Sequence, residues 1–358
     1  MLWIDHTARG LKEREIAAHY YGVVQMADVL CLGEMLVDWV CTTVGAELPD
    51  AVQFTKAPGG APANTAVGLA RQGVSTAFIG RVSKDAFGEW LKAVLRENNI
   101  DVSSTVEDSQ AQTRMAYVVT TASGDRKLAE FSRIACADTR LQVEDLIPEH
   151  FASASVLHFG SISLIEEPAK GSTETAVTMA KKNGMLVSYD PNVRLSLWPS
   201  EAACRDTILK TLNWADIVKI NEDELFFLTG SRDLEQAEKL RLDNNLGIMI
   251  VTLDSRGAYV STANGSKIVA GFNVQLVEAT GAGDGFNAGV IGGLLKYVKG
   301  SSTRRDALDK LSIEQVAEII EHGNAIGALA CTKAGAIPAL PTKAELEKFL
   351  SSQTVKSS

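Results

Sequence analysis

Residues 278–295 read E-A-T-G-A-G-D-G-F-N-A-G-V-I-G-G-L-L, which places two glycines and a carboxylate at the start of an apolar run. Gly281 and Gly283 flank Ala282, and glycines let backbone N–H groups approach a ligand without a Cβ in the way. The N-terminus of a helix formed by this run would attract an anion such as a phosphate. Asp284 would then be suited to take a proton from an incoming hydroxyl. The alternative is an ordinary turn capped by Asp284, which is the commoner explanation of so short a motif.

A second glycine pair lies in the stretch K-A-P-G-G-A-P-A-N of residues 56–64. Gly59 and Gly60 stand between two prolines, a composition typical of a rigid turn with an accessible backbone. An alanine-rich helix is predicted over residues 65–72, so that Asn64 would present its amide to a cleft from the first helical turn. A purely structural turn is the alternative.

Further carboxylates lie in or directly after predicted strands. Asp38 belongs to a strand predicted over residues 37–43, where its carboxylate could bind sugar hydroxyls or be a solvated edge residue. The strand over residues 185–190 leads into D-P-N-V-R. Ligands of parallel sheets bind at the carboxyl ends of the strands. Asp190 and Arg194 are therefore placed for function, with a helix cap as the alternative for Asp190.

The elements that must position these side chains alternate along the chain. Short apolar strands are predicted at 155–160, 185–190, 215–220 and 247–253, with helical segments between them. This βαβ rhythm predicts a parallel sheet with helices on both faces. The strands predicted at 113–121 and 127–132 are joined by the turn S-G-D. Together with residues 37–57 they are interpreted as a small β lid over the site.

The composition is that of an ordinary globular protein: 358 residues, 46% hydrophobic and 22% charged. The net charge of -9 argues against a nucleic-acid partner. Five scattered cysteines without C-x-x-C pairing are expected to be reduced thiols of a cytoplasmic protein. No apolar run approaches the ~20 residues that span a bilayer. The absence of a P-loop and of a strand-linked G-x-G-x-x-G argues against Walker-type and Rossmann sites.

The two glycine stretches resemble the two signatures of one family. G-G-A-P-A-N followed by A-x-x-L-A-R-Q-G is similar to the N-terminal signature of the ribokinase-like carbohydrate kinases, the PfkB family, and T-G-A-G-D-G-F-N-A-G is similar to the C-terminal signature. They occur in the expected order, and the resemblance extends over about residues 29–345. D-P-N-V-R followed by L-W resembles fructokinases and 2-keto-3-deoxygluconate kinases in particular.

The resemblance implies a role for each matching position. Asp284 would be the catalytic base, and the backbone of Gly281, Ala282 and Gly283 the anion hole. The residues implied for the sugar or the phosphate path are Asp38, Gly59, Gly60, Asn64, Arg133 and Arg194. Those implied for ATP are Asn221, Thr252, Asp254, Gly257 and Asn324. Glu224 would order Mg²⁺ through water, which suits an ion that keeps several waters, and Glu278 and Thr280 could hold a monovalent cation such as K⁺.

Two motifs depart from the family pattern. Asp254 stands where the T-L-G-x-x-G motif usually has its first glycine, and an acidic side chain near phosphates would weaken ATP binding unless it points away. Glu278 and Ala279 stand where many members have D-T ahead of T-G-A-G-D. The sequence therefore leaves ATP affinity and K⁺ activation open.

The implied fold is a ribokinase-like three-layer α/β/α domain over residues 27–350, with a mostly parallel central sheet and lid strands at about 37–57 and 113–133. Residues 1–26 are expected to be an N-terminal extension of uncertain status, and residues 351–358 a polar tail. The lid could support a homodimer. Arg114, at an end of the lid hairpin, is expected to be a surface arginine.

The function predicted from these observations is an ATP-dependent sugar kinase that converts fructose to fructose 6-phosphate. Two alternatives remain. The substrate could be 2-keto-3-deoxygluconate, or the chain could be a catalytically weak, fructokinase-like protein that binds a partner. The intact T-G-A-G-D and G-G-A-P-A-N motifs disfavour the second alternative, whereas the departures at Asp254 and Glu278 favour it.

Overall fold

The computed structural model describes residues 26–122 and 126–354. The expected N-terminal extension, apart from residue 26, and the last four residues of the expected tail lie outside the described residues. Residues 351–354 end the helix α12 (Lys343–Thr354). Among the described helices, none combines the length and the apolar character that a membrane crossing requires.

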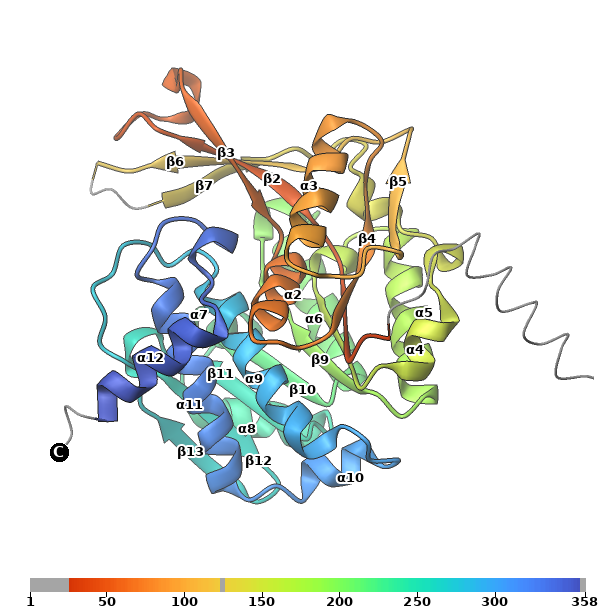
Figure 1. The fold of residues 1–358 in the computed structure, drawn as a ribbon, viewed down its shortest axis with the longest axis vertical. Helices are drawn as coiled ribbons and strands as arrows, with labels where there is room; N and C mark the ends of the chain where they lie inside the picture. Colours follow the sequence, from red (N-terminus) through yellow and green to blue (C-terminus); the bar gives the residue numbers. More distant parts are fainter. Residues whose placement is uncertain (1–25, 123–125, 355–358) are drawn as a thin grey trace, which may run out of the picture.

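A nine-stranded sheet forms the centre of the molecule (Figure 1). Side by side, its strands are β13 (Gly265–Val269), β12 (Ala258–Thr262), β11 (Ile248–Thr252), β10 (Ile217–Asn221), β9 (Leu186–Asp190), β8 (Val156–Gly160), β1 (Val29–Leu32), β4 (Thr76–Ser83) and β5 (Thr105–Asp108). Neighbours from β11 to β5 pair in parallel, and the antiparallel pairings are those of β12 with β11 and with β13. The predicted α/β class with a mostly parallel sheet is confirmed.

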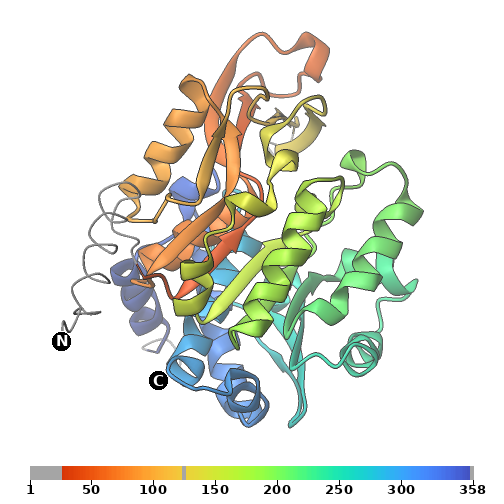
Figure 2. The same cartoon turned by 90° about the vertical axis from the view of Figure 1, so that its right-hand side faces the viewer.

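Helices cover both faces of this sheet (Figures 1 and 2). One face carries α2 (Ala61–Arg71), α3 (Ala86–Glu97), α9 (Ala282–Val298), α10 (Arg304–Asp309) and α11 (Ile313–Ala330), and the other carries α4 (Pro148–Ser153), α5 (Ala169–Lys182), α6 (Glu201–Thr211), α7 (Glu222–Thr229) and α8 (Leu234–Asp243). The two cores alternate along β1, where Val29 and Cys31 pack on one face and Leu30 and Leu32 on the other. Strands that are buried on both faces are continuous apolar runs in the sequence, and for this reason they could be predicted from it.

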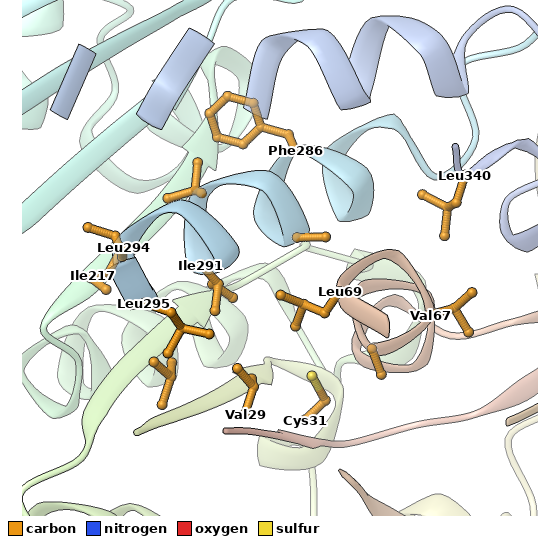
Figure 3. Packing of buried hydrophobic residues seen from close by; sticks show 14 of the residues in the cluster. Val29, Cys31, Val67, Leu69, Ile217, Phe286, Ile291, Leu294, Leu295 and Leu340 are labelled. Atoms are coloured by element: carbon orange, nitrogen blue, oxygen red, sulfur yellow. The ribbon is translucent and has the colours of Figure 1, made fainter. Parts of the chain in front are cut away.

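Helix α9 lies between α11 and α2, on the face of the sheet to which Val29 and Cys31 of β1 point (Figure 3). Ile291, Leu294 and Leu295 of α9 share one buried cluster with Leu69 of α2 and Val29 of β1. Because α9 is buried around most of its circumference, it is apolar apart from its first turn, Asn287 and its C-terminal end. This packing fixes the position of the α9 N-terminus, where the Gly281–Asp284 turn lies.

A second, four-stranded sheet extends beyond the large one (Figure 1). Its order is β3 (Phe54–Gly59), β2 (Leu36–Cys41), β6 (Met115–Thr120) and β7 (Arg126–Phe131). We call these four strands the lid. Its own buried cluster has only three members, Leu36, Ala116 and Phe131. The lid therefore depends on contacts with the rest of the domain, such as the edge-to-face packing of Trp39 against Phe87 of α3 at 5.9 Å.

The expectation that Arg114 is a surface arginine is wrong. Its side chain is buried at the base of β6, where Nε donates to Asp138 Oδ2 at 2.8 Å and Nη1 donates to the Ser132 carbonyl at 2.9 Å. A buried guanidinium is tolerated when a buried carboxylate and further acceptors satisfy it. Since Asp138 lies 24 residues further along the chain, no local pattern indicated this pair.

Candidate active site

The turn before α9 requires the glycine at position 281. Gly281 is the N-cap of α9 and adopts φ 81°, the left-handed region that L side chains avoid. A Cβ at this position would lie 2.9 Å from Ala336 Cα. Residues 282 and 283 then form the first turn of the helix, whose free N–H groups and dipole favour an anion.

Asp284 is buried in this first turn and is 9% exposed. Asn64 of α2 donates from Nδ2 to Asp284 Oδ2 at 2.8 Å, so the two glycine stretches, 220 residues apart, meet here. Burial raises the pKa of Asp284 to about 6 and the Asp190 carboxylate adds to the shift, whereas the Asn64 hydrogen bond and the Lys219 charge oppose it. A carboxylate with this pKa is ionised at neutral pH and yet basic enough to accept a proton.

The Gly59-Gly60 turn brings Asn64 into place. Gly60 adopts φ 106° and is the N-cap of α2, and a Cβ there would collide with the Glu34 carbonyl. Glu34, 3% exposed, accepts the Ala61 N–H on Oε1 at 2.8 Å. Burial raises the pKa of Glu34 to about 7. Glu34 ties the end of β1 to the start of α2, although it lies outside both glycine stretches of the sequence.

A buried lysine lies beside the glycine turn. Lys219 Nζ is 3.0 Å from Asp190 Oδ2, which also accepts from Asn287 Nδ2 at 2.7 Å. A Cβ built on Gly283 would lie 3.1 Å from the ammonium, which therefore borders the backbone of the turn. Burial lowers the pKa of Lys219, but the carboxylates of Asp190 and Glu224 outweigh it, and the pKa is raised. The lysine is charged, and it was missed although it interrupts the apolar run I-V-K-I of this strand.

Glu224 and Asn221 form a reciprocal cap at the start of α7. Asn221 Oδ1 accepts the Glu224 N–H at 2.8 Å, and Glu224 Oε2 accepts the Asn221 N–H at 2.9 Å. Glu224 Oε1 accepts the Val193 N–H at 2.7 Å. Burial, together with the Asp190 charge, raises the pKa of Glu224. The described residues contain no group of three or more His, Cys, Asp or Glu side chains arranged to hold a metal.

Asp38 faces this site from the lid. It lies opposite Ala57 in the β2–β3 pairing, and a Cβ on Gly59 would collide with its carboxylate. Burial raises the pKa of Asp38 to about 7; the Arg126 and Arg194 charges oppose the shift, and those of Glu278 and Asp284 add to it. The lid carboxylate and the carboxylate of Asp284 therefore belong to one electrostatic environment.

The predicted arginines lie in different surroundings. Arg194 is half-buried, donates to the Val193 carbonyl at 3.0 Å, and its charge favours the ionised forms of Asp38 and Asp284. Arg133 is exposed after β7, and within residues 26–122 and 126–354 it makes no hydrogen bond or ion pair. The lid arginine that reaches the domain body is Arg126, which the sequence analysis did not single out: its Nη1 lies 2.8 Å from Glu278 Oε2.

The two residues predicted for a monovalent cation are not equivalent. Glu278 is buried, and besides the contact with Arg126 its Oε2 accepts the Gly335 N–H at 2.8 Å. Thr280 is exposed, and no hydrogen bond links it to another described residue. The two side chains therefore do not form a joint oxygen cage.

A cavity of about 440 Å³ opens beside the α9 N-terminus. Its lining includes the predicted nucleotide residues Thr252, Asp254, Gly257 and Asn324 together with Ala282 and Gly283 of the turn. Asn324 Nδ2 donates to the carbonyls of Val269 and Ala270 at 3.1 Å each and so holds one wall. Asp254 is exposed with φ 50°, a left-handed conformation that Asp tolerates better than most residues. Asn221 does not line this cavity.

Comparisons with known proteins agree with this arrangement. Residues 26–343 match the family described as pfkB family carbohydrate kinase. Fructokinase-1 of Zea mays is 42% identical over 324 residues, covering 90% of this chain and 97% of the maize protein. The ATP-bound fructokinase of Xylella fastidiosa superposes with a TM-score of 0.82 at 28% identity, covering 92% of this chain and all of that one.

A fructokinase double mutant from Vibrio cholerae O395 in a fructose-, ADP- and potassium-bound form superposes with a TM-score of 0.75 at 31% identity, covering 91% and 98% of the two chains. Both signatures suggested by the sequence lie within residues 26–343, which the family model matches, and the resemblance is confirmed. The chain belongs to the pfkB family of carbohydrate kinases and is a fructokinase-like member of it.

Proposed function

We propose that this kinase transfers the γ-phosphoryl group of ATP to the primary hydroxyl of fructose at C6. The observation that carries the proposal is the position of Asp284: it is buried with a raised pKa, follows directly on the cavity-lining residues Ala282 and Gly283, and its charge acts on the lid carboxylate Asp38. The names of the maize and Xylella relatives and the fructose bound in the Vibrio structure support fructose as the acceptor.

The proposed mechanism uses the turn as the meeting point of the two substrates. ATP occupies the cavity lined by Thr252, Gly257 and Asn324, with its phosphates at residues 281–283. Asp284 takes the proton of the C6 hydroxyl while the bond from O6 to phosphorus forms and the bond from phosphorus to the ADP oxygen breaks. The N–H groups of the turn and the Lys219 ammonium offset the charge that spreads over the phosphoryl oxygens.

The sugar is proposed to lie between the turn and the lid. Asp38 would accept hydrogen bonds from sugar hydroxyls, and Asn64 would orient both the sugar and Asp284 from the Gly59-Gly60 turn. Asn64 Oδ1 is buried and has no partner in the described part of the chain, so one acceptor is left for a ligand. Arg194 is the arginine proposed for the phosphate path, because it is half-buried and its charge acts on Asp38 and Asp284, whereas Arg133 is exposed.

The acidic residues near the turn fit a magnesium ion that is held mainly by phosphates and water. Both Glu224 oxygens already accept backbone N–H groups, from Val193 and Asn221, which favours contact through water over direct ligation. When bound, Mg²⁺ would neutralise part of the phosphate charge. Asn221 then acts indirectly, by holding Glu224 in place.

The experiment that tests the proposal measures ADP release with Mg·ATP and a panel of fructose, glucose, ribose, 2-keto-3-deoxygluconate and no sugar. Fructose is expected to give the highest kcat/KM. Preferential turnover of 2-keto-3-deoxygluconate would replace the substrate but keep the mechanism. Absence of turnover with every sugar, in a folded protein that binds ATP, would contradict the proposal and support a partner-binding role.

We also propose a compartment and an assembly. All five cysteines are unpaired, which supports a reducing compartment such as the cytoplasm. The lid has a small core of its own, so a homodimer that covers its outer face is the assembly we propose. Analytical ultracentrifugation distinguishes this dimer from a monomer.

Replacing Asp38 by Ala is expected to raise the KM for fructose by about 10- to 100-fold, because hydrogen bonds to a charged group contribute about 1.5–3 kcal/mol. The KM for ATP should stay unchanged, since Asp38 does not line the nucleotide cavity. Asp50→Ala, an exposed carboxylate between β2 and β3, is the matched control. An unaltered KM for fructose would remove Asp38 from the sugar site.

The pH dependence of kcat/KM for fructose should report the two raised pKa values. Asp38 and Asp284 are ionised above about 7 and about 6, and each loses its function when protonated. Activity is therefore expected to fall as the pH decreases through this range, with a limiting slope above one. Rate measurements from about pH 5 to about pH 9 check this, and Asp38→Asn should leave a single ionisation. A profile that is flat down to pH 5 would contradict the assignment.

A further inference from the structure

The ion pair between Arg126 and Glu278 joins two parts of the chain that are 152 residues apart. Arg126 begins β7 of the lid, and its Nη1 lies 2.8 Å from Glu278 Oε2 and 3.0 Å from Oε1. The side chains are 26% and 7% exposed, so the pair is largely withdrawn from solvent. Screening by salt is weak for such a pair, and its geometry is held by the protein on both sides.

The Glu278 carboxylate also connects two loops of the domain body. Its Oε2 accepts the Gly335 N–H at 2.8 Å, while its backbone N–H donates to the Cys331 carbonyl at 3.2 Å. Three residues later, Gly281 packs closely against Ala336. The lid, the loop 331–336 and the glycine turn of the site are thus linked through one carboxylate.

The same guanidinium acts on the lid carboxylate. Among the charges around Asp38, that of Arg126 is the largest that favours its ionised form, and Glu278 disfavours it. Arg126 therefore acts on two carboxylates, that of Asp38 in the lid and that of Glu278 in the loop that leads into α9. A single positive charge in this position compensates both of them.

The side chains present do not fit the monovalent cation suggested for Glu278 and Thr280. Both oxygens of Glu278 lie within 3.0 Å of the Arg126 guanidinium, and a second cation at these oxygens would be repelled by it. Thr280 is exposed and makes no hydrogen bond to Glu278 among the described residues. The Vibrio fructokinase is known in a potassium-bound form. In this chain the oxygens of Glu278 are neutralised by Arg126 instead of being free for such an ion.

We infer that Arg126 is a positioning residue for phosphoryl transfer: its guanidinium supplies at Glu278 the positive charge expected of a monovalent cation, and it couples the lid to the glycine turn. The inference rests on the proposed sugar kinase function of the same site. It predicts turnover that does not depend on K⁺, because the required charge is part of the chain.

The kinetic test compares turnover of fructose in K⁺ and in tetramethylammonium at equal ionic strength. The unaltered protein is expected to differ by less than about twofold, and Arg126→Gln to lower kcat by about 10- to 100-fold, since small displacements of reacting groups have effects of this size. Arg126→Gln should become stimulated by K⁺ while its KM for ATP stays unchanged, and Arg126→Lys should restore part of kcat. Lys127→Gln, at the adjacent exposed position of β7, is the matched control.

Strong K⁺ stimulation of the unaltered protein, or an Arg126→Gln variant with normal kcat, would overturn the inference. Hydrogen exchange without ligands provides a readout that does not depend on kinase activity. Peptides covering residues 276–286 and 331–337 should exchange faster in Arg126→Gln and in Glu278→Gln than in the unaltered protein. The double variant should exchange at the same rate as the single variants, and Lys127→Gln at the rate of the unaltered protein. If exchange is faster but no sugar is turned over, the proposed function is contradicted while the coupling of the lid to the glycine turn is supported. Unchanged exchange would contradict this coupling.

Discussion

Replacing Asp284 by Asn is expected to reduce the turnover of fructose by at least about 10²-fold, the usual effect of losing a general base. An amide cannot accept the C6 proton, but its oxygen can still accept the hydrogen bond from Asn64 Nδ2. The local structure and ATP binding should therefore persist. Steady-state ADP release measures the loss, and calorimetric titration with ATP measures the binding that should remain. Near-normal turnover would exclude Asp284 as the base.

The same variant should be more stable than the parent at high pH, which separates loss of chemistry from unfolding. Asp284 has a folded-state pKa of about 6 against an ordinary value of 3.8, because burial disfavours its charged form. The folded state therefore loses stability as the pH rises from below 3.8 through about 6. About two pKa units correspond to at most about 3 kcal/mol.

Asn at position 284 has no charge, so the Asp284→Asn variant does not lose stability by burying an ionised carboxylate. Urea unfolding at pH 8 should show Asp284→Asn to be more stable than the parent, and the difference should shrink as the pH approaches 4. A variant that is less stable at pH 8 would contradict the burial cost assigned to the ionised carboxylate.

Replacing Lys219 by Met is expected to have the second large effect. The ammonium lies against the backbone of Gly283, where the phosphoryl charge is proposed to develop, so its loss should lower kcat by about 10²- to 10³-fold. It also leaves the buried Asp190 carboxylate without its cation, which typically lowers the free energy of unfolding by about 3–5 kcal/mol. Steady-state kinetics and urea denaturation measure the two effects separately.

The double variant Lys219→Met/Asp190→Asn distinguishes a catalytic from a structural lysine. Neutralising both partners removes the unpaired buried charge, and the amide introduced at position 190 can still make hydrogen bonds with Asn287 and Asn192. We expect stability to recover and turnover to stay low. If turnover recovers as well, Lys219 serves only to balance Asp190.

Much of the site could be predicted because its constraints are local. The Gly59-Gly60 and Gly281–Asp284 turns need particular residues at particular φ values, and Gly60 and Gly281 do adopt positive φ. The strands buried on both faces are continuous apolar runs, so the sheet was visible in the sequence as well. The cap formed by Asn221 and Glu224 also lies within one helical turn.

Charge pairs between distant segments could not be predicted in this way. The sequence pointed to Arg133 for the lid, yet the structure brings Arg126 to Glu278. In a strand, neighbouring side chains point to opposite faces, and the pairing of β6 with β7 shifts by one residue between Tyr117 and Val118. Which lid residues face the site therefore depends on an irregularity that alternation does not reveal.

The sequence by itself thus determined the fold class, the family and the two turns that hold Asp284 and Asn64, because each depends on residues close together in the chain. Only the tertiary structure decided how the buried charges are compensated: Lys219 by Asp190, Glu278 by Arg126 and Arg114 by Asp138. Burying a charge is costly unless a partner lies within hydrogen-bonding distance. That distance is set by sheet register and by the placement of the lid, which no local segment specifies.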